Sequence, residues 1–343
     1  MNASMEGMAD AAMADEAAGM GRAGTAAELG RRLTARYGLL VVFAILVAVF
    51  SLINPDIYFT SENAQTIAST QAVTAIMAMA ALMPLVTGQF DLSIGSQLAV
   101  TQAVCAGLII ERGWPAGIAM VATLVVGAAY GLVNGMLVVR LRINAFIATL
   151  ATGTLGLGLM QWITGGAEIF GNAPHSFLAL GRNQVAGVPL PFVYVLVLGA
   201  LLWVALEYTR WGRASFATGG NSRAALLAGV HVDRITLISF VLAGLISSVA
   251  GILSVTILGA AHPDVGSEFL LPAFAGAFLG ATSIRPGRFN VWGTVIAVYF
   301  VAAGITGLQQ EGAAFYVQQF FNGGALLIAV AVSQAAAKRR RAQ

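Results

Sequence analysis

Apolar residues run in ten long segments along the chain, with short polar or glycine-containing stretches between them. Most segments are close to the roughly 20 residues that a helix needs to cross about 30 Å of hydrocarbon. This pattern predicts an all-α, polytopic membrane protein with about ten transmembrane helices. We expect the spans at 38–54, 64–87, 92–110, 115–139, 145–163, 190–208, 235–258, 269–284, 289–308 and 315–333.

Positive charge falls almost entirely on one side of these segments. When the sides are numbered alternately from the N-terminus, 16 of the 18 basic residues lie on side one, and only Arg112 and Arg182 lie on side two. The positive-inside rule makes side one the cytoplasm. The sequence therefore predicts a multi-pass protein of the bacterial inner (cytoplasmic) membrane with both termini cytoplasmic.

Composition agrees with this class and divides the chain into three parts. Charged residues make up 10% of the chain, against about 25% in a soluble domain. We expect a disordered cytoplasmic tail at 1–36, a transmembrane domain at 37–334 and a basic cytoplasmic tail at 335–343.

The distribution of charged residues excludes some functions and disfavours others. The only lysine is Lys338, so the chain has no P-loop, in which a lysine binds the phosphates of ATP. Any ATP that drives the protein must be bound by another chain. No acid lies in the middle of a predicted span, and Asp91 and Glu207 sit at span ends. This disfavours an ion-coupled carrier, which usually places ionisable groups within the membrane. The histidines fall in loops without metal-ligand spacing.

Uncharged polar residues recur at helical spacing within several spans. Facing lipid, hydroxyl and amide groups would lack hydrogen-bond partners, so we expect them to face other helices or a wet cavity. A stripe of neutral donors and acceptors would suit a neutral, hydroxyl-rich solute. The residues are Thr66, Thr70 and Thr74 in the second span, Ser93, Gln97 and Thr101 in the third, and Tyr130 and Asn134 in the fourth.

Small residues recur at helical spacing as well. Gly127, Gly131 and Gly135 form a doubled G-x-x-x-G pattern in the fourth span, and Gly276 and Gly280 repeat it in the eighth. Such spacing lets helix backbones approach closely in lipid. We interpret these glycines as helix-packing positions.

Glycines bracket an acid and a hydroxyl after the second span, in the sequence GQFDLSIG from Gly88 to Gly95. Glycine allows a break in the helix, and Asp91 or Ser93 could cap the next helix by accepting its free N–H groups. Alternatively, the charge of Asp91 acts in gating or pairs with a loop arginine such as Arg285 or Arg288.

The largest predicted cytoplasmic loop spans 209–234 and contains a short helix. The turn Gly-Gly-Asn-Ser at 219–222 supplies a capping residue, and the apolar residues 224–228 would form the helix, which Gly229 ends. A short exposed helix is what docking to a soluble partner requires. We expect Ala225 to leave room there for the partner's surface.

Four stretches, in order along the chain, resemble the ribose/xylose-type sugar permease family, the membrane subunits of ATP-binding-cassette (ABC) importers. Residues 88–95 resemble its Gly-Gly-x-Asp-Leu-Ser-Val-Gly signature, with Gln89 in place of the second glycine. Residues 144–150 read NAFIATL where the family has Pro-Ser-Phe-Ile-Ala-Thr-Leu, and 212–229 match the family's long inner loop closely. The match over 280–294 is looser, because four residues replace small ones: Pro286, Arg288, Phe289 and Asn290.

This resemblance implies an ABC importer permease for a monosaccharide or a similar small neutral polyol. Its implied partners are a cytoplasmic ATPase subunit, a periplasmic or extracellular solute-binding protein, and a second permease copy or a paralogue. ATP and Mg²⁺ would be bound by the ATPase, so the chain itself would be no enzyme and would carry no cofactor or metal. Related permeases also serve nucleosides, autoinducer-like solutes and amino acids; an ion-coupled carrier or channel is the alternative from another class.

Two groups of residues are the candidate functional residues. In the resembling family, the long inner loop contacts the ATPase. The expected coupling-loop residues are Gly212, Arg213, Gly219, Gly220, Asn221, Ala224, Ala225 and Gly229. The expected residues of the translocation pathway or gate are Thr70, Thr74, Gly88, Asp91, Ser93, Gly95, Gln97 and Asn134.

The charge asymmetry predicts that 164–189 lie outside and 209–234 inside. Single cysteines would replace Asn183 and Ser222 in a Cys105→Ala background. An impermeant thiol reagent, added to cells with a permeabilised outer membrane, should label the cysteine at Asn183 alone. Labelling at Ser222 without labelling at Asn183 would reverse the orientation.

Overall fold

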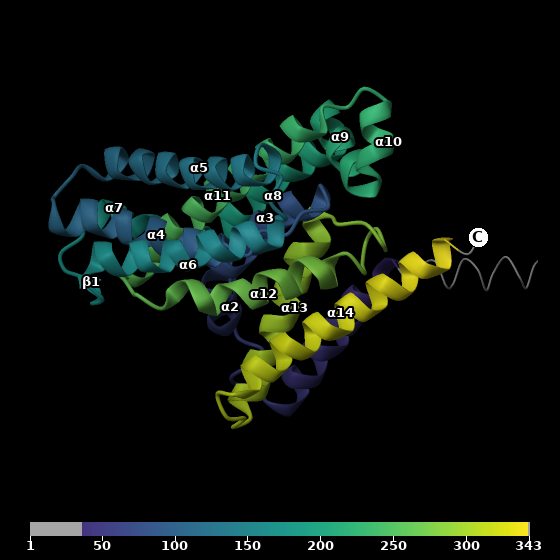
Figure 1. The fold of residues 1–343 in the computed structure, drawn as a ribbon. Helices are drawn as coiled ribbons and strands as arrows, with labels where there is room; N and C mark the ends of the chain where they lie inside the picture. The colour runs from purple at the N-terminus through teal and green to yellow at the C-terminus, as the bar shows by residue number, and fades with distance from the viewer. Residues whose placement is uncertain (1–35, 342–343) are drawn as a thin grey trace, which may run out of the picture.

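The computed structural model of the chain describes residues 36–341, and the tail expected at 1–36 falls outside them up to residue 35. The chain is all-α, as predicted, and its helices pack into a bundle (Figure 1). The helices are Arg36–Ile53, α2 Ser61–Thr70, α3 Ala72–Val86, α4 Ile94–Ala106 with its π-helical extension η1 Gly107–Glu111, α5 Ala116–Val139, α6 Ala145–Thr164, α7 His175–Arg182, α8 Leu190–Tyr208, α9 Arg210–Gly220, α10 Ser222–Leu227, α11 Val232–Leu258, α12 Val265–Gly280, α13 Val291–Gln310 and α14 Val317–Arg341.

Strands are confined to two-residue pieces in the loops. Strand β1, Ile169–Phe170, pairs antiparallel with β4, Ala260–Ala261. Strand β2, Gln184–Val185, pairs antiparallel with β3, Val188–Pro189. The first pair ties the loop after α6 to the loop after α11.

The predicted spans agree with the helices to within a few residues. Within residues 36–341, eight helical stretches are long and apolar enough to cross a membrane, with α2 and α3 counted as one, and α12 is a shorter apolar helix. The tenth expected span falls in α14. Helices α9 and α10 lie at one end of the bundle, and α7 with β1 lies at the other (Figure 1). The chain is therefore a multi-pass membrane protein.

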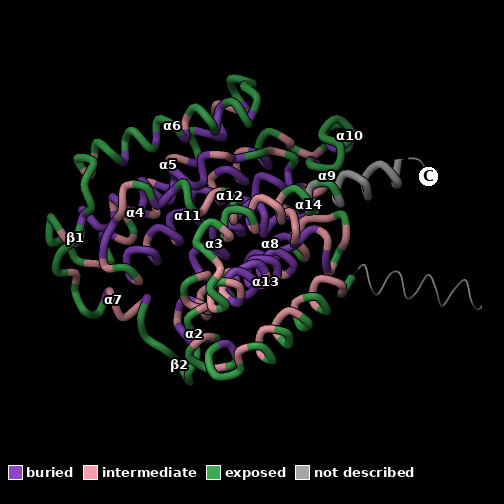
Figure 2. Tube along the Cα trace, turned by 90° about the horizontal axis from the view of Figure 1, so that it is seen from below, coloured by how far each residue is buried: buried purple, intermediate pink, exposed green. Residues whose placement is uncertain are grey.

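Helix α3 forms the centre of the bundle. All of its 15 residues are buried, and it contacts α8, α9, α11, α12 and α13. Figure 2 shows the buried segments gathered in the interior around α3 and α13, with exposed ones along α6 at the edge. The expected second span, 64–87, is not one continuous helix, because Gln71 separates α2 from α3.

Glycines set the closest helix contacts, as the sequence predicted. A Cβ atom at Gly127 or Gly131 in α5 would clash with backbone carbonyls of Gly244 and Phe240 in α11. In lipid there is no hydrophobic force between helices, so such close van der Waals packing holds them together.

Polar side chains begin several helices by accepting a backbone N–H. The Thr60 hydroxyl accepts from Asn63 at the start of α2, and the Asn144 side chain accepts from Phe146 at the start of α6. Such caps satisfy donors that have no partner within the helix. They explain why these helices start where the structure shows them.

A Gly131→Val substitution should lower the amount of folded protein severalfold, because α5 would have to move away from α11. Overpacking of this kind typically costs about 1–3 kcal/mol or more. Gly158→Val is the matched control, since nothing lies within 4 Å of a Cβ built on Gly158 of α6. Size-exclusion chromatography of a fluorescent fusion would measure the folded amount. Equal yields for the two variants would show that this contact is not needed.

Candidate functional site

Residues 87–93 form a break between α3 and α4 at the end of the bundle where α9 lies, since Gly88 packs against Gly219. Helix α3 ends at Val86, and Gly88 has a left-handed backbone with φ of +80°. The carboxylate of Asp91, which is 1% exposed, accepts hydrogen bonds from the Ser93 N–H at 2.9 Å and from the Gln97 amide at 3.2 Å. Burial raises the pKa of the Asp91 carboxyl to about 6, and the bonds from Ser93 and Gln97 oppose that rise.

The capping hypothesis for this break describes Asp91 better than Ser93. Asp91 accepts the N–H of the residue before α4, whereas Ser93 makes no side-chain cap bond to the helix. Instead the Ser93 hydroxyl accepts the amides of Gln97 and Asn134, each at 2.7 Å. The bond from Asn134 ties the break to α5.

The predicted pathway residues of this region are closed off in the structure. Ser93, Gln97 and Asn134 are completely buried. Gly95 packs its backbone against the carbonyl of Gly266 in α12. A role in translocation for these residues remains a prediction.

The alternative ion pair for Asp91 is not what the structure shows. Arg285 and Arg288 instead pair with Glu207 at the end of α8, and the guanidinium of Arg288 also lies 3.6 Å from the centroid of the Phe216 ring. The Glu207 side chain is only 10% exposed. This cluster joins the α8–α9 corner to the loop between α12 and α13, and the sequence reading noted Glu207 without finding its partners.

The expected coupling loop folds as α9 and α10. Asn221 caps α10 by accepting the Ala224 N–H at 3.0 Å, and Gly229 ends it with a φ of +83°. Gly220 has open space around it, and the Arg213 guanidinium lies 3.5 Å from the Tyr208 carbonyl.

The expectation for Ala225 is wrong, because Ala225 is 5% exposed and packs within this chain rather than leaving room for a partner. Helix α10 lies on α9 and α11, which cover that face. The exposed large apolar side chains of α10 are Leu226 and Leu227, which are 62% and 85% exposed. The sequence reading missed them; two adjacent leucines in a polar, cytoplasmic loop were the available signal.

The coupling loop touches the break directly through two glycines. Gly219 of α9 lies against the Val86 carbonyl, and its Cα is 3.4 Å from a Cβ built on Gly88. Gly212 makes a similar approach to the Leu206 carbonyl at the α8–α9 corner. These contacts join backbone to backbone, so no flexible side chain intervenes between the loop and the break that follows α3.

Thr70 and Thr74 line a polar cavity of about 240 Å³, called the outer polar cavity below. It lies between α2, α3, α12, α13 and α14. Its polar lining consists of Thr70, Gln71, Thr74, Glu268, Thr306, Gln309, Gln318 and Asn322. The sequence reading found the two threonines but none of the amides. Among residues 36–341, no three His, Cys, Asp or Glu side chains gather as metal ligands.

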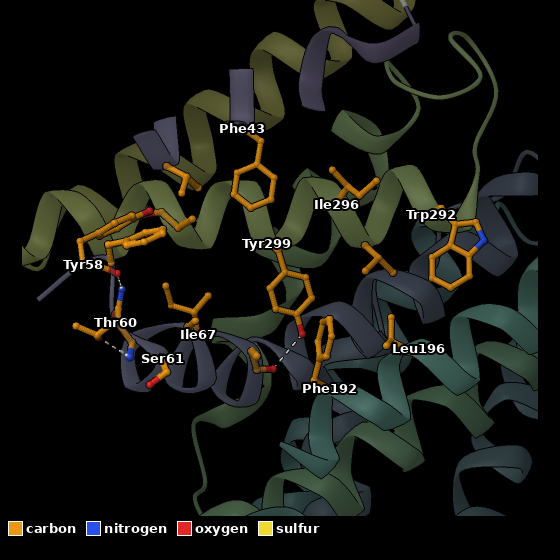
Figure 3. Close-up of a pocket in the computed structure, with 17 residues that line it drawn as sticks. Phe43, Tyr58, Thr60, Ser61, Ile67, Phe192, Leu196, Trp292, Ile296 and Tyr299 are labelled. Carbon is orange, nitrogen blue, oxygen red and sulfur yellow. Dashed lines mark hydrogen bonds between the residues drawn. The ribbon is translucent and has the colours of Figure 1, made fainter. Parts of the chain in front are cut away.

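A larger crevice of about 700 Å³ runs beside the first helix, but its lining is apolar (Figure 3). Phe43, Phe192 and Trp292 are among its aromatic walls. Its tyrosine hydroxyls are already used: Tyr58 donates to the Ala303 carbonyl at 3.1 Å, and Tyr299 to the Ala68 carbonyl at 3.0 Å. This crevice therefore offers a hydroxylated solute few hydrogen-bond partners.

Residues 63–331 match the family described as "Branched-chain amino acid transport system / permease component". The ribose import permease protein RbsC of Escherichia coli K12 is 36% identical over 283 residues, covering 81% of this chain and 87% of that protein. The D-allose transport system permease protein AlsC of the same strain is 30% identical over 88% of this chain and 93% of its own length. The autoinducer 2 import system permease protein LsrD of Escherichia coli O9:H4 is 31% identical over 84% of this chain and 89% of its own length. No solved structure matches the chain.

Substitutions of Asp91 should separate a capping role from a charge role. Asp91→Asn keeps an acceptor for the Ser93 N–H, and the carbonyl of Gln97, unpaired in the structure, can turn to accept the new amide. This variant should fold and retain transport. Asp91→Leu leaves buried donors unpaired at a cost of about 1–3 kcal/mol each, so it should lower the folded amount. Expression and uptake, measured together, would check both expectations. A well-expressed but inactive Asp91→Asn protein would show that the charge is required.

Proposed function

Since the chain belongs to the family of branched-chain amino acid transport system permease components, we propose that it is the membrane subunit of an ABC importer for a monosaccharide or a similar small neutral polyol. It would sit in the inner membrane with α9 and α10 in the cytoplasm. ATP and Mg²⁺ would bind to a separate ATPase chain, so this chain would contribute the pathway and not the hydrolysis.

The observation that carries this proposal is the similarity to sugar permeases along most of the chain. RbsC and AlsC, named for ribose and allose, align with 81% and 88% of the chain. The break and the coupling loop both lie within residues 63–331, which match the family. By analogy with the family, we propose that the chain pairs with a second permease copy or a paralogue and receives its solute from a binding protein outside.

The chemistry of the outer polar cavity favours a neutral polyol over an amino acid. Its lining includes one carboxylate, from Glu268, and no Lys, Arg or His. An amino acid brings its own carboxylate, which proteins bind best with a cation or a bidentate guanidinium. The similarity to LsrD keeps autoinducer 2 as the second candidate solute.

Helix α10 would be the docking element for the ATPase. Leu226 and Leu227 lie mostly exposed at the cytoplasmic end, on a helix that is capped and braced against α9 and α11. An exposed apolar pair of this kind is typical of a protein interaction site.

Reconstitution would test the function. The chain would be placed in liposomes with a candidate ATPase and a candidate binding protein from the same organism, and labelled D-ribose would be added outside. We expect uptake that requires ATP and the binding protein and that is lost with an ATPase unable to hydrolyse ATP. Uptake driven by an ion gradient without ATP would contradict the proposal and favour an ion-coupled carrier.

A Leu227→Asp substitution should abolish co-purification of the ATPase and ATP-driven uptake while leaving the amount of folded permease unchanged. The side chain is 85% exposed, so the new charge costs this chain little but would be buried unpaired against a docked partner. Val185→Asp, which places the same charge at a 58% exposed site of β2 on the opposite side, is the matched control. Normal co-purification with Leu227→Asp would show that α10 does not dock the ATPase.

A further inference from the structure

We propose that the outer polar cavity is a binding site for the transported solute on the permease itself, and that Glu268 and the surrounding amides hold a single-ring neutral polyol there. This inference rests on the proposed function and adds to it an intermediate binding site, which the solute would occupy between the binding protein and the cytoplasm. Nothing in the family match or the names of the relatives assigns such a site.

One buried polar group of the cavity has no partner within the described part of the chain. The Asn322 side chain is only 8% exposed, makes no hydrogen bond and lines the cavity. A buried amide left unpaired costs about 1–3 kcal/mol, so a molecule in the cavity would complete its hydrogen bonds. Glu268, Gln309 and Gln318 line the same cavity but are exposed, and their side chains make no hydrogen bond or ion pair within the described residues, so they are free to bind a solute.

The chemistry of these groups matches sugar hydroxyls. A carboxylate accepts hydrogen bonds from two neighbouring hydroxyls, and each amide both donates and accepts. The ring of Phe269 also lines the cavity and provides an apolar wall for the C–H face of a sugar ring. The volume of about 240 Å³ is just below the roughly 300–1,000 Å³ of pockets for drug-sized ligands, which suits one ring and not two.

The position of the cavity suits a solute that arrives from outside. Glu268 lies in the first turn of α12, Gln318 near the start of α14 and Gln309 near the end of α13. With the predicted orientation, all three positions are at outer helix ends. At the inner end, a Cβ on Gly276 of α12 would clash with Val298 of α13. This close packing separates the cavity from the cytoplasm.

Two other ligand classes fit less well. An anion would meet the carboxylate of Glu268 without a basic lining residue. A bare cation would leave most of the amide N–H groups without an acceptor. A neutral polyol satisfies both the donors and the acceptors.

Cysteine protection would test the site on the full chain in nanodiscs. A Gln318→Cys variant in a Cys105→Ala background would be alkylated from outside by an impermeant reagent. D-Ribose at about twice its dissociation constant should slow the reaction roughly threefold, whereas sucrose, with two rings, should not. Gln319→Cys, one residue further and outside the lining, should react at the same rate with or without ribose.

The outcomes distinguish this inference from the proposed function. If the complete transporter takes up ribose but neither ribose nor other monosaccharides slow alkylation at Gln318, the cavity is not a solute site. Protection by sodium in place of sugars would also overturn the inference and indicate a cation site. If the complete transporter takes up no sugar at all, the proposed function itself fails.

Uptake by Glu268 variants provides a second test. Glu268→Leu should lower sugar uptake about tenfold, while expression and ATPase co-purification stay unchanged. The reason is that losing about 1.4 kcal/mol of hydrogen bonding lowers the affinity for the sugar by a factor of ten. Glu268→Gln keeps an acceptor and should recover most of the uptake. Glu311→Leu removes an exposed acid of the neighbouring outer loop that does not line the cavity and should transport normally. Equal uptake by Glu268→Leu and Glu311→Leu would overturn the inference.

Discussion

Lipid offers no hydrogen bonds, so each polar group inside this bundle depends on a partner that the protein supplies. Many membrane hydroxyls bond back to their own helix: Thr101 donates to the Gln97 carbonyl at 2.7 Å, Thr123 to Ala119 at 2.8 Å and Ser248 to Gly244 at 2.8 Å. These side chains need nothing from a solute. Other polar side chains lack such a partner. Some are buried elsewhere in the bundle, such as the Gln97 carbonyl and the Ser247 hydroxyl. The Asn322 side chain lines the outer polar cavity, where a solute could complete its hydrogen bonds.

The transmembrane helices could be predicted closely because one physical requirement, the length of apolar chain that crosses the membrane, determines them. The glycine contacts of α5 with α11 were predictable for a similar reason, since small residues at fixed spacing mark close helix packing. The break at Gln71 was not predictable, because no glycine or proline marks it. It reflects the packing of α2 and α3 against different neighbours: α2 contacts α8 and α13, while α3 also contacts α4, α9, α11 and α12.

The candidate site was less predictable, because its residues meet only through tertiary packing. Helical spacing placed Thr70 and Thr74 together, but Gln309, Gln318 and Asn322 come from two other helices and lie near helix ends, where a sequence reading expects solvated side chains. The burial of Ala225 could not be predicted from the sequence for a related reason. Helix α10 has six residues, too few for periodicity to show which face is covered, and the covered face proved to be that of Ala225.

Helix α10 is connected through packed contacts to the break at 87–93 and to the loop that follows α12. Helix α10 packs on α9, and the backbone of Gly219 in α9 contacts Gly88 and Val86 at the break. The hydrogen bond from the Asn134 amide to the Ser93 hydroxyl then links the break to α5. At the α8–α9 corner, Glu207 pairs with Arg285 and Arg288 in the loop that follows α12, the helix that supplies Glu268 to the cavity. Close-packed backbone and ion pairs to the largely buried Glu207 carboxylate have few intermediate arrangements, so such contacts hold or give way as units. A force applied at Leu226 and Leu227 would therefore reach α4 and α12 together.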